Sequence, residues 1–211
     1  MENQIDGNLT AQTKTRYNRI APYYDILEII SERAFSGWRR RLLARARGKV
    51  LEVGVGTGKN FPYYSEGVDV TGLDIADRML IHARLRADKL GFPIQLMEGD
   101  VQSLPFPENS FDTAVATFVF CSVPDPVLGL KELGRVVKPG GKILLLEHVR
   151  IDKPLIGFIM DIMNPFFLHF IGPNINRRTV ENVGKAELLI EKIEHLGFMQ
   201  MVKMIIAHPG K

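Results

Sequence analysis

The sequence predicts an α/β protein built on one doubly wound, mostly parallel sheet with helices on both faces. Three observations predict this fold. Apolar, strand-like segments alternate with helical segments from residue 48 onward. The segment KVLEVGVGTGKN, residues 49–60, places a buried strand directly before glycines at positions 54, 56 and 58. The length of 211 residues fits a single domain with a substantial core.

The expected elements follow one another in a regular order. Two helical stretches, near 10–30 and 31–47, precede the sheet. Strands are expected near 49–53, 68–73, 93–97, 111–118, 141–147 and 198–207, and helices near 58–66, 76–90, 125–137 and 185–196. Residues 149–184 form an insert rich in Phe, Met and Ile. Its prolines, Pro154, Pro165 and Pro173, predict a series of short helices.

The glycine-rich loop and two acids indicate the class of ligand. Glycine has no Cβ, so the loop can turn sharply and let a ligand lie against its backbone. Asp74 ends the next strand, VDVTGLDI, where a carboxylate suits ribose hydroxyls. Glu52 precedes the loop and would repel the pyrophosphate of a dinucleotide. The spacing G-x-G-x-G with this acid therefore favours a nucleoside carrying a cationic amino-acid tail over NAD.

Composition limits the compartment and the metal chemistry. The single cysteine, Cys121, excludes an intrachain disulfide and favours a reducing cytosol. The first residues lack the pattern of a signal peptide. The most apolar segment, PLIGFIMDIMNPFFLHFIG, is interrupted by Asp161 and by Asn164-Pro165, so we expect no transmembrane helix. No Cys/His set has the spacing of a zinc site, and we expect a cytoplasmic protein without a metal.

Positive charge is concentrated in one stretch. Between Arg33 and Lys49 there are seven basic residues and no acid, although the net charge is only +3. Phe35, Trp38, Leu42 and Ala46 recur there at helical spacing. One interpretation is a solvated helix face, and the other is an amphipathic helix on anionic lipid, where each basic residue contributes about 1 kcal/mol. Nucleic acid is disfavoured because no recognised module accompanies the charge.

Several motifs together resemble one enzyme family. In chain order they are EVGVGTG, GLDIADRML, LMEGDVQSLPFPENSFDTAVATFVFCSVPD and ELGRVVKPGGKILLLEH, and they resemble the motifs of class I S-adenosylmethionine-dependent methyltransferases. LPFPENSFD, RVVKPGG and the N-terminal RYNRIAPYYD are closest to a subgroup with three kinds of member. These are ubiquinone and menaquinone C-methyltransferases, bacterial phosphatidylethanolamine N-methyltransferases and some small-molecule thiol methyltransferases. The resemblance implies a Rossmann-like fold and S-adenosylmethionine as cofactor. The rival interpretations are an NAD-linked reductase and a nucleoside-binding regulator without activity.

The resemblance also implies a division of the single domain, 1–211. Residues 1–47 would be a helical lid, 48–148 the cofactor-binding core, 149–184 a substrate-side insert, and 185–211 the last helix and strand. Members of the family usually end in two antiparallel strands, with the seventh lying between the fifth and the sixth. Only MQMVKMIIAH remains here after the predicted last helix. We therefore expect either a sheet that lacks its seventh strand or a shortened sequence.

The resemblance assigns cofactor contacts residue by residue. Glu52 would face the amino group, and the backbone of the glycine loop would face the carboxylate, with Thr57 as a supporting candidate. Asp74 would bind the ribose. The expected cofactor-binding residues are Tyr17, Glu52, Gly54, Gly56, Gly58, Asn60, Asp74, Ile75, Met79, Asp100, Val101, Thr117 and Phe118. Alternatives stay open for some of them: core packing for Met79 and the tyrosines, and a turn cap for Asp100.

Catalytic candidates are few. Tyr24 lies in the predicted lid, and His148 ends strand five, where it is a base, a substrate contact or a loop cap. His169, in the insert, is a weaker candidate for the same roles as His148. Cys121 is more typical of a small buried residue than of a nucleophile.

The insert favours a hydrophobic methyl acceptor. Its large apolar residues include Phe158, Met160, Met163, Phe166, Phe167 and Phe170. Apolar linings suit lipid-like ligands. We expect a phospholipid head group first, an isoprenoid quinone second and a small thiol or amine third, with docking on the inner face of the membrane. Alternatively, these side chains simply close the core.

Overall fold

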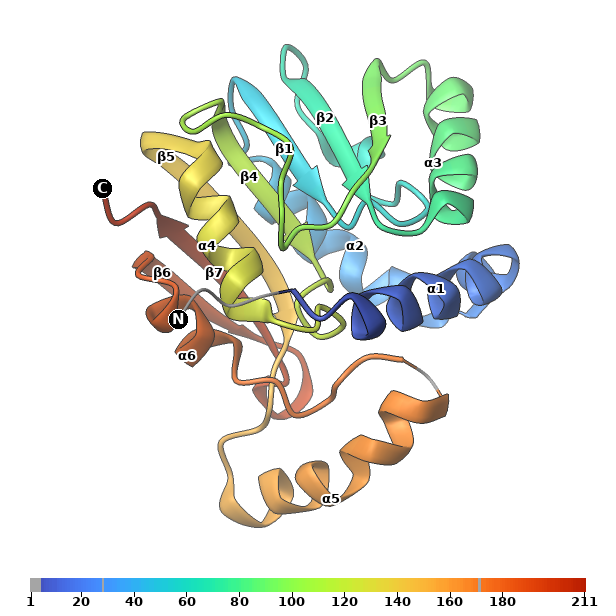
Figure 1. Cartoon of the computed structure of the whole chain (residues 1–211), viewed down its shortest axis with the longest axis vertical. Helices are drawn as coiled ribbons and strands as arrows, with labels where there is room; N and C mark the ends of the chain where they lie inside the picture. Colours follow the sequence, from blue (N-terminus) through green and yellow to red (C-terminus); the bar gives the residue numbers. More distant parts are fainter. Residues whose placement is uncertain (1–4, 28, 171) are drawn as a thin grey trace.

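A seven-stranded sheet organises the chain. The structure is a computed structural model that describes residues 5–27, 29–170 and 172–211. The strands are β1 (Lys49–Val53), β2 (Asp69–Asp74), β3 (Ile94–Glu98), β4 (Phe111–Thr117), β5 (Val137–His148), β6 (Leu189–Leu196) and β7 (Val202–His208). Their order is β3-β2-β1-β4-β5-β7-β6, and only β7 is antiparallel to its neighbours (Figure 1). The predicted doubly wound, mostly parallel sheet is therefore confirmed.

Helices cover both faces of this sheet. They are α1 (Gly7–Leu27), α2 (Ile29–Leu43), α3 (Asp77–Leu90), α4 (Pro126–Val136), α5 (Pro154–Phe170) and α6 (Thr179–Lys185). Leu133 of α4 and Val183 of α6 share a buried cluster with Leu145 of β5. Leu42 of α2 belongs to the cluster on the opposite face. Among the described residues, no helix is both long and apolar enough to cross a membrane.

Local sequence signals set several of the helix boundaries. Asp125 caps α4, because its side chain accepts hydrogen bonds from the backbone N–H groups of Val127 and Leu128 at 3.0 Å. Pro126 occupies the first turn, where its missing N–H costs nothing. Gly91 ends α3 in the left-handed conformation, with φ of 61°. These ends match the predicted helices 76–90 and 125–137 closely.

The carboxyl-terminal prediction was wrong. Residues 185–196 were expected to be a helix, but residues 189–196 form the edge strand β6, and the helix α6 precedes them. Glu, Lys and Leu favour a helix locally, yet pairing with β7 overrides that preference. The seventh strand is consequently present, because β7 lies between β5 and β6. Glu191 and Lys192 on β6 are charges typical of a protected sheet edge.

Two further expectations failed for local reasons. Residues 58–66 contain only a short 3₁₀ turn, Phe61–Tyr63, instead of a helix. The insert contains the 17-residue helix α5 and most of the short helix α6, where a series of short helices was expected. Pro154 is the first residue of α5, which a helix tolerates, and Pro165 lies within α5 at the cost of one backbone hydrogen bond.

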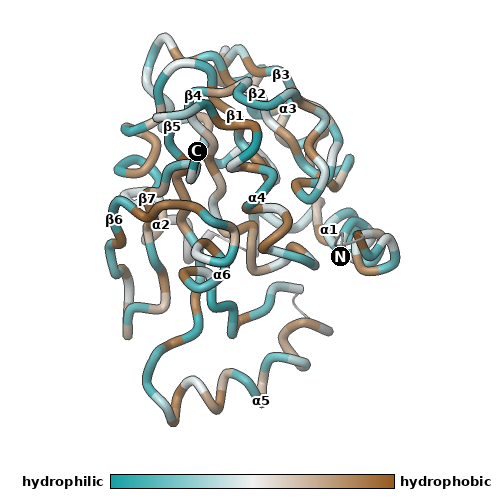
Figure 2. Tube along the Cα trace, turned by 60° about the vertical axis from the view of Figure 1, so that its left-hand side comes forward, coloured by the Kyte–Doolittle hydropathy of each residue, from teal (hydrophilic) through white to brown (hydrophobic). Residues whose placement is uncertain are grey.

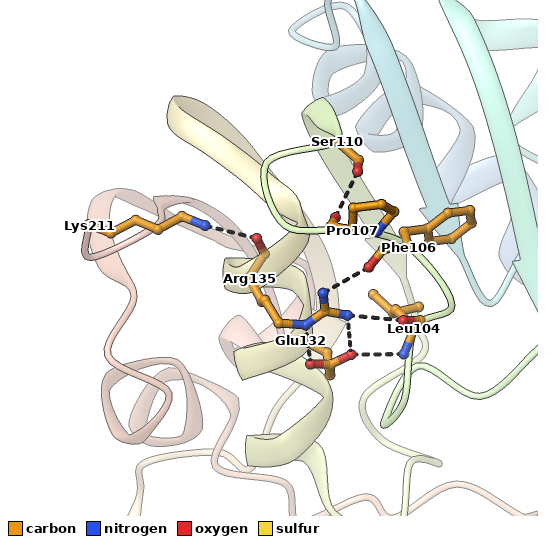
Figure 3. A network of polar contacts seen from close by, with 7 residues as sticks. All are labelled: Leu104, Phe106, Pro107, Ser110, Glu132, Arg135 and Lys211. Carbon is orange, nitrogen blue, oxygen red and sulfur yellow. Dashed lines mark hydrogen bonds and ion pairs between the residues drawn. The ribbon is translucent and has the colours of Figure 1, made fainter.

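A polar network fixes the loop that connects β3 to β4. The guanidinium of Arg135 on α4 donates to the carbonyls of Leu104 at 2.9 Å and Phe106 at 2.8 Å (Figure 3). Glu132 pairs with Arg135 and accepts from the Leu104 N–H at 2.8 Å. Partial burial opposes ionisation of Glu132, but its hydrogen bonds prevail and lower its pKa. The network therefore holds this loop, whose first residues face the cleft described next.

Candidate active site

A cleft of about 690 Å³, including its open mouth, lies where the strand order reverses between β1 and β4. Ligands of open α/β sheets bind at this position, beyond the carboxyl ends of the strands. Most of the predicted site residues line its wall. They are Tyr17, Tyr24, Gly54, Gly56, Asp74, Ile75, Met79, Asp100, Val101, Thr117 and Phe118. Glu52, Gly58, Asn60 and His148 do not line it.

Glycine is required at the three loop positions for different structural reasons. All are left-handed, with φ of 63°, 55° and 79° at Gly54, Gly56 and Gly58. A Cβ on Gly54 would lie 2.5 Å from the side chain of Val119, and one on Gly58 would lie 2.4 Å from the ring of Phe61. A Cβ on Gly56 would meet nothing within 4 Å. Gly54 and Gly58 thus permit packing, whereas Gly56 presents bare backbone to the open cleft.

Asp74 connects the glycine loop to the end of β2. One carboxylate oxygen accepts from the N–H of Gly56 at 2.8 Å, and the other accepts from the N–H of Ala76 at 2.9 Å. Burial raises the Asp74 pKa, and these backbone hydrogen bonds oppose the shift. The Ile75 backbone also donates to Asp74, and because a carboxylate has about four acceptor positions, Asp74 keeps capacity to accept from a ligand hydroxyl.

Glu52 and Asn60 form a layer behind the wall. The Glu52 carboxylate accepts from the Asn60 amide at 2.9 Å and from the Tyr64 hydroxyl at 2.8 Å. Burial raises the pKa of Glu52 to about 7, although both hydrogen bonds act in the opposite direction. The proposed contact between Glu52 and a ligand amino group therefore stays a prediction. In this structure the carboxylate supports the loop from behind.

Arg39 of α2 completes this buried layer, and our sequence reasoning missed it. Its Nη1 donates to the side-chain oxygens of Asn60 and Thr117, each at 2.8 Å, and Thr117 lines the cleft. The guanidinium carbon lies 5.4 Å from the ring centroid of Phe118. We counted Arg39 only as one charge in a basic run. Its spacing of four residues from Phe35 places it on the apolar stripe, and that signal indicates burial.

Other members of the basic run contact their own chain. Arg41 and Arg45 both pair with Glu194 of β6, and Arg40 lies over the ring of Tyr63. The side chains of Arg33, His169 and Phe170 lie outside the described part of the structure. Lipid docking and a solvated helix face both stay predictions for the exposed members of this stretch.

Phe118 forms the floor of the cleft in a strained conformation. Its φ is 59°, in the left-handed region that costs a non-glycine residue about 1–2 kcal/mol. Its N–H donates to the Leu146 carbonyl at 2.7 Å. The ring packs against Phe35 and His148, with centroids 4.7 and 4.6 Å away. His148 is thus held in an aromatic cluster and does not line the cleft, and its role stays a prediction.

Helix α1 covers the cleft from the opposite side. The Tyr17 hydroxyl shares a 2.6 Å hydrogen bond with Ser122, and burial raises the Tyr17 pKa well above its usual range. Tyr24 lies 6.5 Å from Tyr17, ring to ring. The Thr57 hydroxyl donates to Asp25 at 2.6 Å and so ties the glycine loop to this helix. Both tyrosines line the cleft, and their role as lid residues stays a prediction.

Asp100 and Met79 have the structural contacts that the sequence suggested, and a ligand contact at each stays a prediction. Asp100 accepts from the Gln102 N–H at 2.9 Å, as in a turn cap, and from the Thr10 hydroxyl at 3.3 Å. Met79 is packed in a small buried cluster with Ala21. Both residues nevertheless line the cleft, so a structural role and a ligand contact are compatible at each position.

The loop after β4 supplies wall residues that we did not predict. Val119, Ser122, Val123 and Pro124 all face the cleft. Their place directly beyond a central strand is the signal that could have identified them. Cys121, in the same loop, is buried, and burial raises its pKa to about 12, so its thiolate is unavailable as a nucleophile.

The chain is similar to known methyltransferases. The family described as "Methyltransferase domain" matches residues 51–145. A demethylmenaquinone methyltransferase of Thermus thermophilus is 32% identical over 202 residues, covering 92% of this chain and 90% of that protein. A phosphatidylethanolamine N-methyltransferase of Cereibacter sphaeroides is 42% identical over 120 residues, 54% of this chain and 59% of that protein.

A solved structure extends the comparison to the fold. It comes from Thermotoga maritima and is described as an S-adenosylmethionine-dependent methyltransferase, possibly a histamine N-methyltransferase. The TM-score is 0.70 at 20% identity, over 92% of this chain and 98% of that one. At this identity the likeness shows the fold alone.

Proposed function

Because the chain belongs to the class I S-adenosylmethionine-dependent methyltransferases, in the subgroup of the ubiquinone and menaquinone C-methyltransferases, we propose that it methylates the amine of a phosphatidylethanolamine-type phospholipid. It is an enzyme, and S-adenosylmethionine is its cofactor. The identity of the acceptor, the roles of individual residues and the division into lid, core and insert are parts of the proposal.

The cleft has the chemistry that this cofactor requires. Gly56 offers open backbone to the methionine portion, Asp74 has acceptor capacity for the ribose, and apolar side chains such as Ile75 and Val101 suit the adenine. When bound, S-adenosylmethionine supplies an electrophilic methyl group on a sulfonium. The remaining tasks of the protein are to hold an acceptor in line at about 3 Å and to exclude water. Helix α1, with Tyr17 and Tyr24, is the candidate for excluding water.

The proposal of an amine acceptor rests on the ionisable side chains that line the cleft and on whether they can act as a base. Among the described wall residues these are Tyr17, Tyr24, Asp74 and Asp100. Both aspartates already accept from backbone N–H groups, although burial raises the Asp74 pKa, and the raised Tyr17 pKa keeps its hydroxyl protonated at neutral pH. A carbon acceptor needs a base for ring activation, whereas an amine can release its proton to water. This arrangement supports N-methylation over C-methylation.

A quinone acceptor is the second candidate, and a specific observation favours it. The demethylmenaquinone methyltransferase of Thermus thermophilus matches nearly the full length of this chain, including the insert, whereas the match to the phosphatidylethanolamine enzyme covers only 54% of the chain. In this alternative, His148 would have to reach the cleft by a movement of the aromatic cluster around Phe118.

An acceptor screen distinguishes the candidates. Wild-type enzyme with methyl-labelled cofactor is offered phosphatidylethanolamine, a demethylated isoprenoid naphthoquinone and a small thiol, each in the same detergent micelles. We expect label in the phospholipid amine, at a rate that Cys121→Ser leaves within a few-fold. Label in the quinone alone, with loss of activity in His148→Ala, would replace the first candidate by the second. Label in the thiol alone would overturn both.

We also propose a cytoplasmic location with action at the inner face of the membrane. The basis is the single buried cysteine, which suits a reducing compartment, together with an acceptor that resides in bilayers.

A further inference from the structure

Helix α5 has its apolar residues on the outside. It lies apart from the sheet, below the carboxyl ends of the strands, and carries several hydrophobic stretches (Figures 1 and 2). At about 100° per residue, six large side chains fall on one arc of about 140°. They are 41% to 72% exposed and comprise Leu155, Phe158, Ile159, Ile162, Met163 and Phe166. A helix that only closed the core would bury this arc.

Polar groups on the opposite side of α5 attach it to the rest of the protein. Asp161 pairs with Arg150 at 2.8 Å and accepts from Asn176 at 3.1 Å. Asn164 accepts from the Ile175 N–H at 2.9 Å. The helix is therefore held by its polar face and presents its apolar face outward, which is the reverse of the usual arrangement for a helix in a water-soluble domain.

We propose that this outward face of α5 docks on the surface of a lipid bilayer, with the helix lying in the plane of the interface. Seventeen residues give a length of about 25 Å, shorter than the hydrocarbon core of about 30 Å, so the helix cannot span the membrane. Among the described side chains of α5 the apolar arc carries no charged residue, and the exposed Asp152 and Lys153 directly precede the helix. Burial of apolar side chains, with a minor contribution from charge, drives the binding of such a helix to a membrane interface.

The size of the face argues against a second copy of the chain. Stable protein–protein interfaces use roughly 20–30 residues from each partner. The arc offers six side chains on a convex helix, far below that requirement. A bilayer needs no complementary groove, because the side chains insert among mobile lipids.

The segment after α5 connects the docking face to the cleft. Asn174 donates to the carbonyl of Cys121 from its N–H at 2.8 Å and from its amide at 2.9 Å. Arg177 donates to the carbonyl of Val123 at 2.7 Å, and Val123 lines the cleft. Docking through α5 would thus hold one rim of the cleft near the lipid head groups. This inference rests on the proposed lipid acceptor.

The test uses two matched double variants. Phe158→Ser with Ile162→Ser removes two exposed apolar side chains, 60% and 63% exposed and four residues apart, from α5. Ile81→Ser with Leu85→Ser removes two with the same spacing, 56% and 62% exposed, from α3. Co-sedimentation with vesicles of phosphatidylethanolamine and phosphatidylglycerol is measured for each. We expect about tenfold weaker binding for the α5 variant and no change for the α3 variant.

Further measurements distinguish a loss of vesicle docking from misfolding of the variant and from an error in the proposed acceptor. S-adenosylhomocysteine binding should be equal in all three proteins, because both pairs lie on the surface. Equal vesicle binding by the two variants, or none by the wild type, would overturn the proposal. A concentration-dependent dimer lost only in the α5 variant, without vesicle binding, would assign the face to a second copy. If vesicle binding depends on α5 but phospholipid in micelles is not methylated, docking stands and the acceptor is wrong.

Discussion

The cofactor cleft and the α5 insert are built in opposite ways. Around the cleft, polar side chains such as Asp74 and Arg39 are buried and hydrogen-bonded, and apolar side chains point inward. In the insert, polar residues such as Asp161 face the protein and large apolar residues face outward. This contrast is what we expect if the cleft binds a ligand within the core and if α5 docks on a bilayer as proposed.

The largest effect should come from the glycine loop. In Gly54→Val, the left-handed backbone and the clash with Val119 together cost about 2–5 kcal/mol, and the loop must move to relieve them. We expect S-adenosylhomocysteine affinity to fall at least about 100-fold by calorimetry. Gly67→Val is the control, because Gly67 has φ of 81° but open space around it. An equal loss in both variants would attribute the effect to backbone strain alone.

A smaller loss of affinity should follow Asp74→Ala. It removes the proposed acceptor for the ribose hydroxyls and the tie to the Gly56 N–H, at about 1–3 kcal/mol, or roughly 5- to 150-fold in affinity. Cys121→Ser alters a neighbouring buried residue without a predicted ligand contact and should stay within a few-fold. The assignment of the cleft fails if calorimetry ranks these two variants in the reverse order.

The buried acids predict a pH dependence of stability. Burial raises the pKa of Glu52 and of Glu147 to about 7, above the ordinary 4.5. A raised pKa means that stability is fully present below pH 4.5 and declines as the pH rises through 7. Each group contributes on the order of 1–3 kcal/mol to this decline. We therefore expect the free energy of unfolding in urea to be lower at pH about 8 than at about 5.

Glu147→Gln isolates one of these groups. The new side chain can still accept from the N–H groups of Val119 and Phe120 but cannot ionise. The decline in unfolding free energy with pH should therefore shrink, leaving the share of Glu52. An unchanged pH profile would mean that Glu147 is not protonated near neutrality in the folded protein.

The smallest effect on global stability should come from detaching the insert. Arg150→Met removes the partner of Asp161, which is 41% exposed, so urea unfolding should change by less than about 1 kcal/mol. Chymotrypsin, however, should cleave within α5 several-fold faster. Arg178→Met, which breaks an exposed pair with Glu181 on α6, is the control. Equal cleavage rates in both variants would show that Arg150 does not hold α5.

Sequence reasoning succeeded at positions whose residue types and spacing indicate a ligand. It failed where tertiary packing determines the local structure. The glycine loop and Asp74 carry their chemistry in their spacing, so most of the cleft wall was predictable. Residues 189–196 have helix-forming composition, and only pairing with β7, formed later in the chain, makes them a strand. Arg39 was overlooked because charge suggested exposure, whereas two specific acceptors make its burial possible.

The position of β7 has a consequence for how the chain acquires its structure during synthesis. Residues 202–208 are translated after β5 and β6, yet they pair with both and separate them. Until they emerge, the edge of β5 lacks its partner, and residues 189–196 have no strand to pair with. An unpaired edge of this kind is a site for association between nascent chains. Synthesis of β7 therefore determines when the edge of β5 is paired and protected from aggregation.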